Sequence, residues 1–141
     1  MTTEDRIVKW NEDRNITSKP EDVLVVLCIV EELFEYLGVN NSMPKERLKK
    51  LVNKYAGYIL EEANALGCKA SETDKIDALC DINVFADGFI HRSGFDPNKA
   101  MNQCLLHIES RKGIMGENGK WQKNPDDLVY EPRYDECRYD G

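Results

Sequence analysis

The stretch VLVVLCIVEELFEYLG, residues 23–38, is apolar enough to be buried, yet it carries Glu31, Glu32 and Glu35 near its end. Burying an unpaired carboxylate costs several kcal/mol. At spacings of three and four residues, these carboxylates project to one side of a helix. They lie in its C-terminal half, where the macrodipole disfavours negative charge. Local helix energetics therefore do not explain them, and basic side chains, solvent or a metal ion must compensate their charge.

A second stretch, DKIDALCDINVFADGFI at residues 74–90, repeats this combination of acidic and apolar residues. Asp74, Asp77 and Asp81 fall on one stripe of a helix, and apolar residues cover most of its remaining circumference, which predicts a helix at the centre of a bundle. Two acidic helices of this kind are typical of carboxylate metal sites inside bundles. All-oxygen ligands favour Mg²⁺, Mn²⁺ or Ca²⁺. The alternative is a solvated acidic edge, or salt bridges to the lysine-rich segment at residues 42–67.

Capping residues and glycines divide the chain into five predicted helices. Their approximate ranges are 3–15, 18–38, 42–67, 71–93 and 97–113. Beyond residue 113 the helical pattern fails, and glycines and prolines indicate a small hairpin at Glu117 to Gly119 or an arm. We therefore predict an all-α bundle of about five helices in a single domain, 1–141. Its helical core spans about 3–113, followed by an irregular C-terminal arm, 114–141.

Composition excludes several classes of partner. The 141 residues carry a net charge of −7 and a pI of about 4.9, which argues against binding nucleic acid or an anionic membrane. The longest apolar run, Val23 to Val30, is too short to cross a bilayer. The N-terminal sequence lacks the apolar segment of a signal peptide, and the five cysteines form no C-x-x-C pair. We expect a cytoplasmic protein without a structural zinc site.

A basic segment follows the fifth predicted helix. It contains Arg111, Lys112, Lys120 and Lys123, with Trp121 between the two last lysines. A Mg²⁺ site held by carboxylates implies a substrate with phosphates, whose remaining charge these residues would neutralise, while the tryptophan would stack on a base. The alternative is an ordinary basic turn that complements the dipole of the preceding helix.

Several motifs resemble one enzyme family. EELFE, residues 31–35, resembles the EExxE signature of the all-α nucleoside triphosphate pyrophosphohydrolases, which include the MazG proteins, dimeric dUTPases and phosphoribosyl-ATP pyrophosphohydrolases. DALCDINVFADGF, residues 77–89, resembles their second acidic helix and is closest to the phage-type MazG-like proteins. ESRKG and GKWQK resemble the segment that follows. The similarity spans roughly residues 18–123.

The resemblance implies a helical homodimer or homotetramer that hydrolyses a nucleoside triphosphate to the monophosphate and pyrophosphate. Mg²⁺, or Mn²⁺ as a substitute, would be the cofactor. Glu32, Glu35 and Asp81 would be metal ligands, and Glu31 a ligand or a residue that orients water. If phage-encoded, the protein would act in the host cytoplasm.

The sequence departs from the family in its second motif. Most members have an acidic residue three positions before the one matched by Asp81, where this chain has Ala78. Asp77, one turn back, is then the acidic partner. The resulting hypothesis places Mg²⁺ on Glu32, Glu35, Asp77 and Asp81, with Glu31 or Glu35 as the catalytic base. Lys112, with Arg111, Lys120 and Lys123, would hold the phosphates.

Other assignments stay open at this point. The candidates for base or sugar contacts, each of which packing or helix surface explains better, are Trp10, Asn11, Asn83, Phe85, Asn102 and Trp121. The Glu61-Glu62 pair is an extra ligand or an exposed helix end. The preferred base and sugar are not determined by the sequence. The alternative function is a non-catalytic oligomerisation module with acidic salt bridges between subunits, although the two acidic helices contain few basic residues themselves.

Overall fold

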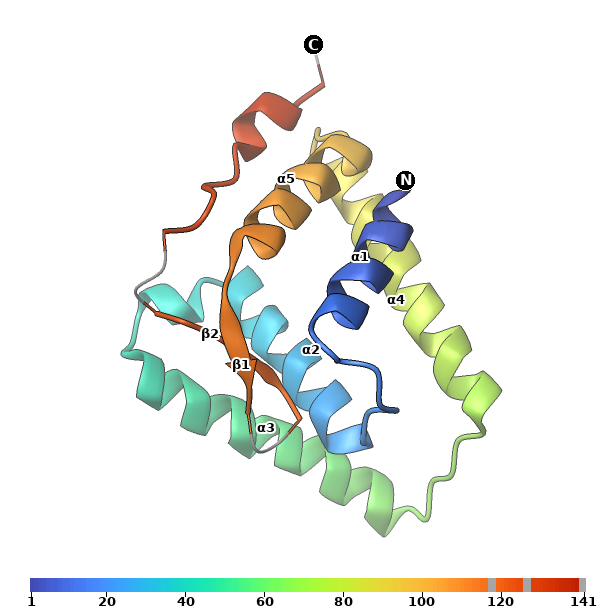
Figure 1. Cartoon of the computed structure of the whole chain (residues 1–141). Coiled ribbons are helices and arrows are strands. Elements are labelled where there is room, and N and C mark those ends of the chain that lie inside the picture. The colour runs from blue at the N-terminus through green and yellow to red at the C-terminus, as the bar shows by residue number, and fades with distance from the viewer. Residues whose placement is uncertain (117–118, 126–127, 140–141) are drawn as a thin grey trace. The chain divides into compact units, whose positions relative to one another are not determined.

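The computed structural model describes residues 1–116, 119–125 and 128–139, and it is mostly helical, at 66%. The predicted all-α class and irregular C-terminal arm are confirmed. The elements are α1 (Thr3–Asp13), α2 (Asp22–Tyr36), η1 (Val39–Asn41), α3 (Lys45–Ala65), α4 (Glu72–Arg92), α5 (Pro97–Ser110), β1 (Gly113–Met115), β2 (Trp121–Lys123) and η2 (Tyr134–Cys137) (Figure 1). Of the helices in the described ranges, none is both long and apolar enough to cross a membrane.

Local capping chemistry explains where three helices begin. Thr2 caps α1, and its hydroxyl accepts from the Asp5 amide while the Asp5 carboxylate accepts from the Thr2 amide, both at 3.0 Å. Ser71 and Asp74 form the same reciprocal pair at the start of α4. The Asp96 side chain caps α5, directly before a proline at its first position. These starts agree with the prediction because each depends on residues four or fewer apart.

Two other helices begin later than predicted. α2 starts at Asp22 rather than near Ser18, and α3 starts at Lys45, after Pro44 in an extended conformation with ψ of 151°. A proline fixes φ but leaves ψ free, so it occupies the N-cap here instead of the first helical turn. Gly38 adopts a φ of +78° directly after the end of α2, as expected for the glycine that stops a helix.

The chain groups into two compact units. Unit 1 comprises Met1–Thr17, Ala70–Gly116 and Trp121–Gly141, and unit 2 comprises Ser18–Lys69 and Glu117–Lys120. The single domain expected from the sequence stays a prediction, and each unit is described by itself.

Unit 2 is a pair of helices, α2 and α3, joined by η1. Its core is small: Val30 of α2 lies with Leu48, Val52 and Ala56 of α3, and each is at most 7% exposed. Phe34, one turn beyond Val30, packs on this core and meets the Tyr55 ring edge-on at a centroid distance of 5.7 Å. The side of α2 that faces α3 is therefore set by Val30 and Phe34.

In unit 1, α1 lies along α5 and is held there by polar contacts of Arg6 and Trp10. The Arg6 guanidinium donates to both carboxylate oxygens of Glu109, at 2.5 and 3.2 Å, and to Asn102 at 2.7 Å. Trp10 Nε1 donates to the Ile108 carbonyl at 3.2 Å. These contacts place the C-terminal end of α1 beside the C-terminal end of α5.

The C-terminal arm runs back along α5 (Figure 1). His107 Nδ1 and the Tyr130 carbonyl are 2.6 Å apart, so this nitrogen carries the proton and donates it. Further along, Gln103 Oε1 accepts from the Tyr130 hydroxyl at 2.7 Å and from the Arg133 amide at 3.0 Å. Cys137 of η2 is only 2% exposed and is one of the buried residues of this unit. The arm is irregular in backbone but fixed by its contacts.

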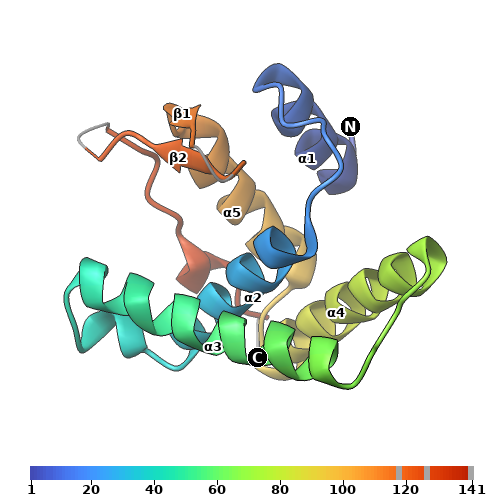
Figure 2. The same cartoon turned by 90° about the horizontal axis from the view of Figure 1, so that it is seen from below.

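The sequence predicted that α4 is a central helix of the bundle. That prediction is wrong, because no residue of α4 is buried. Figure 2 shows α4 meeting α5 near one end only. The prediction failed because apolar residues around most of a helix indicate that it needs to be covered, but they do not indicate which segment covers it. Its exposed large apolar residues are Ile76, Leu79, Ile82, Val84, Phe85 and Phe89, between 39% and 68% exposed.

The Arg6–Glu109 contact gives a first testable prediction. The Arg6–Glu109 ion pair is bidentate, and only 19% of the Arg6 side chain is exposed. We therefore expect R6Q to lower the free energy of unfolding by about 1 kcal/mol. The arginine lowers the pKa of Glu109, so the pair's contribution should be present at neutral pH and lost as pH falls through the carboxylate range.

The matched control is K9Q. Lys9 pairs with Asp13 at 2.6 Å within α1, but both side chains are more than half exposed, so the expected cost is only a few tenths of a kcal/mol. Urea unfolding at pH 7 and at pH 4 measures both variants. Equal effects of R6Q and K9Q at pH 7 would contradict the assigned role of Arg6.

Candidate functional site

The three carboxylates of the first acidic motif lie in the last turns of α2. Since Val30 and Phe34 face the core of unit 2, the neighbouring positions Glu31, Glu32 and Glu35 are turned away from it. α2 has no basic residue in its last turn to offset them. The carboxylates are thus placed together by the helix repeat and by the packing of the neighbouring apolar side chains.

Glu31 is compensated by an ion pair. Its carboxylate accepts from the Lys120 ammonium, and the two side chains are 33% and 38% exposed. Partial burial acts to lower the pKa of Lys120, but the hydrogen bond and the attraction to Glu31 outweigh it, and the net effect is to raise that pKa. Lys120 was predicted to bind phosphate. In the structure it supplies a positive charge next to the Glu31 carboxylate.

Glu32 and Glu35 are compensated less well. Desolvation raises the pKa of Glu32, the negative charge of Glu35 and a hydrogen bond with it raise that pKa further, and Lys120 opposes the shift. A hydrogen bond between two carboxyl groups requires one proton between them. Glu32 can therefore bind a proton at higher pH than an isolated glutamate, or exchange that proton for a cation.

The donor set fits a magnesium ion in part. Among residues 1–116, 119–125 and 128–139, no group of three or more His, Cys, Asp or Glu side chains is arranged to hold a metal. Mg²⁺, however, usually keeps several waters and takes only one or two carboxylates together with substrate phosphates. Glu32 and Glu35 supply two such carboxylates within one helical turn, and all their donor atoms are oxygen.

The second acidic motif lies on α4 of unit 1. Asp74 is committed to capping: hydrogen bonds from the Ser71 amide and hydroxyl lower its pKa. Asp77 and Asp81 are exposed. The four predicted metal ligands are thus divided between the two units, and the complete set of Glu32, Glu35, Asp77 and Asp81 stays a prediction.

Two of the predicted phosphate-binding residues, Arg111 and Lys112, meet in one pocket of unit 1 with Trp121, which was predicted to stack on a base. This pocket has a volume of about 440 Å³ and is lined by Asp13, Arg14, Arg111, Lys112, Gly113 and Trp121. Arg111 follows the end of α5, and Trp121 begins β2. The basic pocket, as we call this set, therefore joins the ends of α1 and α5 to the hairpin.

Trp10 contacts two residues of the basic pocket, Trp121 and Arg14. The Trp10 and Trp121 rings meet edge-on, with centroids 5.2 Å apart. The Arg14 guanidinium lies 4.4 Å from the Trp10 centroid and 5.6 Å from that of Trp121. Such cation–π contacts hold the guanidinium in place while leaving donors available.

The hairpin that carries Trp121 requires a glycine at its start. Gly113 pairs with Lys123 and Met115 with Trp121 in an antiparallel register. A Cβ atom added at Gly113 would lie 2.0 Å from the Gln122 carbonyl oxygen, so only glycine permits this close approach. The predicted hairpin is present in its two strands, and Glu117 lies outside the described residues. Lys123 ends β2 and is exposed.

The candidates for base or sugar contacts separate into two groups. Trp121 lines the basic pocket and Trp10 packs against it, whereas the amides of Asn11 and Asn102 are engaged in helix contacts with Ile7 and Arg6. On exposed α4, the Phe85 ring stacks near Phe89 at 6.0 Å, and Asn83 is also exposed. The Glu61-Glu62 pair is exposed near the end of α3, as the simpler of its two explanations requires.

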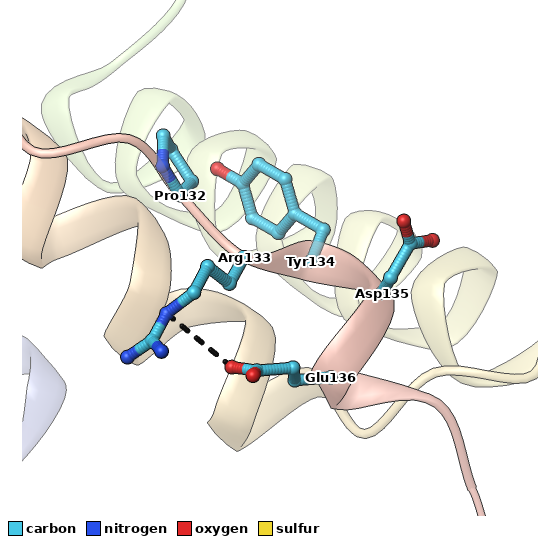
Figure 3. A pocket seen from close by; sticks show the side chains of 5 residues that line it. All are labelled: Pro132, Arg133, Tyr134, Asp135 and Glu136. Atoms are coloured by element: carbon cyan, nitrogen blue, oxygen red, sulfur yellow. Dashed lines mark ion pairs between the residues drawn. The ribbon is translucent and has the colours of Figure 1, made fainter.

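A second hollow, of about 450 Å³, lies beside η2 and is lined by residues 132–136 (Figure 3). Figure 3 shows Arg133 and Glu136 pointing toward each other, and their ion pair measures 3.3 Å. Burial and the nearby Cys104 thiol raise the pKa of Tyr134 to about 12, so this phenol stays neutral. Since all five lining residues come from one turn of the arm, we assign the hollow a structural role.

Sequence reasoning missed Arg14. It is the C-cap of α1, and Asn15 follows in the left-handed region at a φ of +57°. The amide of Ile16 bonds back to the Asn11 carbonyl at 2.8 Å, which completes the helix end. An asparagine after an amphipathic run signals such an end, but the docking of α1 on α5 that brings Arg14 to Arg111 has no local signal.

Comparisons with known proteins identify no relative, because no family model, no curated protein and no solved structure matches the chain. The resemblance to MazG-like enzymes rests on the motifs alone.

The close Glu32–Glu35 pair gives a second prediction. In metal-free buffer, E35Q should raise the midpoint of thermal unfolding at pH 7 by about 1–3 °C, because it removes the repulsion that raises the pKa of Glu32. A carboxyl whose pKa is raised by folding destabilises the protein as pH rises through its titration range. The gain should therefore shrink at pH 4, where Glu32 is protonated.

E62Q is the control for this measurement. Glu62 occupies the last turns of α3 as Glu35 does those of α2, so both substitutions remove a charge that the helix dipole disfavours. Only the excess of E35Q over E62Q reports on the pair. Calorimetry with EDTA at both pH values measures it, and no excess at pH 7 would refute a coupled pair.

Proposed function

We propose that this protein is a Mg²⁺-dependent nucleoside triphosphate pyrophosphohydrolase of the MazG-like type. Its substrate is a nucleoside or deoxynucleoside triphosphate, and its products are the monophosphate and pyrophosphate. The proposal combines the motif resemblance with the geometry of unit 2.

The observation that carries the proposal is the pairing of Glu32 with Glu35. The negative charge of Glu35 and a hydrogen bond with it raise the pKa of Glu32, which costs stability that a purely structural helix end has no reason to lose. A divalent cation removes that repulsion. Carboxylates with a perturbed pKa are, for this reason, enriched at functional sites.

When bound there, Mg²⁺ would neutralise phosphate charge and make a bound water more acidic. Glu32 and Glu35 are the residues that would hold it, and Mn²⁺ would substitute. The contribution of Asp77 and Asp81, predicted from the sequence, stays a prediction.

The roles of the remaining charged groups follow from their contacts. Lys120 engages the Glu31 carboxylate, so Glu31 is less available to accept a proton from water. We therefore assign the role of general base to Glu35, with Glu31 orienting Lys120. Lys120 adds a positive charge beside the carboxylates, where phosphate oxygens of a substrate would lie.

The chemistry gives the third prediction. Release of pyrophosphate and monophosphate from one subset of NTPs and dNTPs should require Mg²⁺ or Mn²⁺ and stop with EDTA. E35Q should lower kcat by at least about 100-fold, within the range for loss of a general base, while the circular dichroism spectrum stays unchanged.

E62Q again serves as the control and should keep full activity, since Glu62 lies on α3 away from the assigned residues. Binding of Mn²⁺, followed by electron paramagnetic resonance, should weaken in E32Q and in E35Q but not in E62Q. Hydrolysis that persists in EDTA or in E35Q would refute the mechanism. Absence of hydrolysis across the whole panel would refute the proposal for unmodified nucleotides.

The second candidate function is a non-catalytic oligomerisation module, and the exposed apolar side of α4 favours it. α4 has 21 residues, and none of them is buried. Isolated helices are marginal in water, because most helical stability in proteins comes from packing of an apolar side. We propose that a second copy of this chain covers that side, consistent with a homodimer or homotetramer.

The charges of α4 suit an antiparallel pair of copies related by a two-fold axis. Its first turn carries Glu72 and Asp74, and its last turn carries His91 and Arg92. In an antiparallel pair, the acidic end of each α4 meets the basic end of the other. A parallel pair would place like charges together and is disfavoured.

The fourth prediction tests this surface. I82K, in the middle of the apolar side, should weaken self-association at least about tenfold, because it buries a charge in each half of a symmetric interface. T73K is the control: it adds the same charge to α4 nine residues away, two and a half helical turns, and so on the opposite side.

Analytical ultracentrifugation over a range of concentrations measures the wild type and both variants. A monomeric wild type, or equal weakening by I82K and T73K, would refute self-association through α4. An assembly that depends on Ile82 and shows no hydrolysis would favour the module over the enzyme.

A further inference from the structure

The lysine-rich helix α3 has no role in the functions proposed above. Its segment 45–54 contains five exposed cations and one carboxylate, on a protein whose net charge is −7. The sequence left open that these cations form salt bridges to the acidic helices, but within the described residues of unit 2 none of them belongs to an ion pair. The cations repel one another, which costs energy unless anions or solvent offset it. They are Lys45, Arg47, Lys49, Lys50 and Lys54.

Two exposed tyrosines lie next to these cations. Tyr55 and Tyr58 are 43% and 56% exposed, and their ring centroids are 6.3 Å apart. The Lys54 ammonium lies 5.6 Å from the Tyr55 centroid. From the other side, Phe34 packs on the core of unit 2 and meets Tyr55 edge-on, so this ring is held in place. Exposed rings of fixed orientation bury a large apolar area at low entropic cost, and tyrosine and arginine are enriched among the residues that dominate protein interfaces.

Helical spacing places basic and apolar residues of α3 on one continuous surface. They recur every three or four residues from position 47 to position 58, the spacing that brings side chains to one side of a helix. This surface is about 16 Å long, or about three helical turns. It lies beside the side of α3 that packs on α2 and is not part of that core. We call it the α3 strip, and its members are Arg47, Lys50, Leu51, Lys54, Tyr55 and Tyr58.

The charge and the shape of the α3 strip indicate its partner. An amphipathic acidic helix presents carboxylates and apolar side chains at the same spacing, and it can pack side by side with α3. An extended peptide would need an exposed sheet edge, whereas the described elements of unit 2 are helices. An anionic membrane is disfavoured, because the protein as a whole carries a charge of −7. The pairing of two α4 helices proposed above leaves the α3 strip uncovered.

We propose that the α3 strip binds an acidic amphipathic helix of a separate protein. Its three cations pair with carboxylates of that helix, while Leu51, Tyr55 and Tyr58 pack against its apolar side chains. The surface belongs to α3 alone, so the proposal does not rest on the carboxylates of α2 or on hydrolysis.

A synthetic peptide of defined charge tests this surface. The probe is a fluorescently labelled helix of about 20 residues, with leucines at spacings of three and four and glutamates beside them, long enough to cover the strip. Its fluorescence anisotropy should rise with saturation as the full-length protein is added. A control peptide with lysine in place of every glutamate should not bind. Raising the salt concentration should weaken binding of the acidic peptide, because exposed charges are screened.

Variants separate the strip from the general charge of α3. K54E should weaken binding of the acidic peptide about tenfold, because it replaces an attraction by a repulsion. K49E is the matched control: it makes the same change of charge on the same helix, five residues and so about 140° away around the axis. Y58A should also weaken binding about tenfold but leave its salt dependence unchanged, since it removes only an apolar contact. Circular dichroism verifies that each variant is folded.

The proposal is overturned if the acidic peptide shows no saturable binding, if both peptides bind equally, or if K54E and K49E have equal effects. Sedimentation with vesicles of phosphatidylserine and phosphatidylcholine covers the rival partner. Wild-type protein that binds these vesicles through Lys54, but does not bind the peptide, would assign the α3 strip to a membrane surface and overturn the proposal. Failure of hydrolysis is a separate result, because E35Q should bind the peptide as tightly as the wild type.

Discussion

Docking against α5 is the constraint on which unit 1 depends. α1 attaches to it through Arg6 and Trp10, and the C-terminal arm attaches through contacts with Gln103 and His107. α1 contains no buried residue, and in the described residues of the arm regular structure is limited to the hairpin strands and η2. Polar contacts of defined geometry hold both segments on α5, and they also fix the ends of α1 and α5 side by side. The basic pocket is a consequence of that arrangement.

Unit 2 differs from unit 1, because the same helix, α2, contributes both to its apolar core and to its acidic cluster. Val30 and Phe34 determine how α2 sits on α3, and the helix repeat then places Glu32 and Glu35 one turn apart on the side away from the core. The repulsion that raises the pKa of Glu32 follows from that spacing. Lys120 relieves the charge of Glu31 but not that of the pair. An arrangement that lowers stability for no structural gain is the usual mark of a site kept for binding or chemistry.

Short-range features of this fold were predictable from the sequence, and long-range ones were not. Thr2, Ser71 and Gly38 mark helix ends through contacts within a few residues, and the predictions there are confirmed. The return of the arm along α5 depends on pairs such as His107 with Tyr130, which are 23 residues apart and carry no periodic signal. The exposure of α4 was missed for a related reason: an apolar helix indicates that something covers it, but the sequence does not say what.

The same limit applies to the candidate site. The carboxylates of α2 were found because helical spacing brings them together, and Arg111, Lys112 and Trp121 because they are close in sequence. Arg14 was missed because it is 97 residues from Arg111, whose carbonyl it contacts. Residues that converge from distant segments become visible only after the docking of those segments is known.

The two candidate functions are linked through α4. Asp77 and Asp81 lie on the helix whose apolar side is uncovered, so any partner that covers α4 also restrains these aspartates. If they are metal ligands, as the sequence predicts, a cation that binds them more tightly in the covered state must strengthen association by the same factor. Self-association that is independent of Mg²⁺ would then separate α4 from the metal site. Association that strengthens with Mg²⁺ would mean that the enzyme is assembled by the same surface that makes it an oligomer.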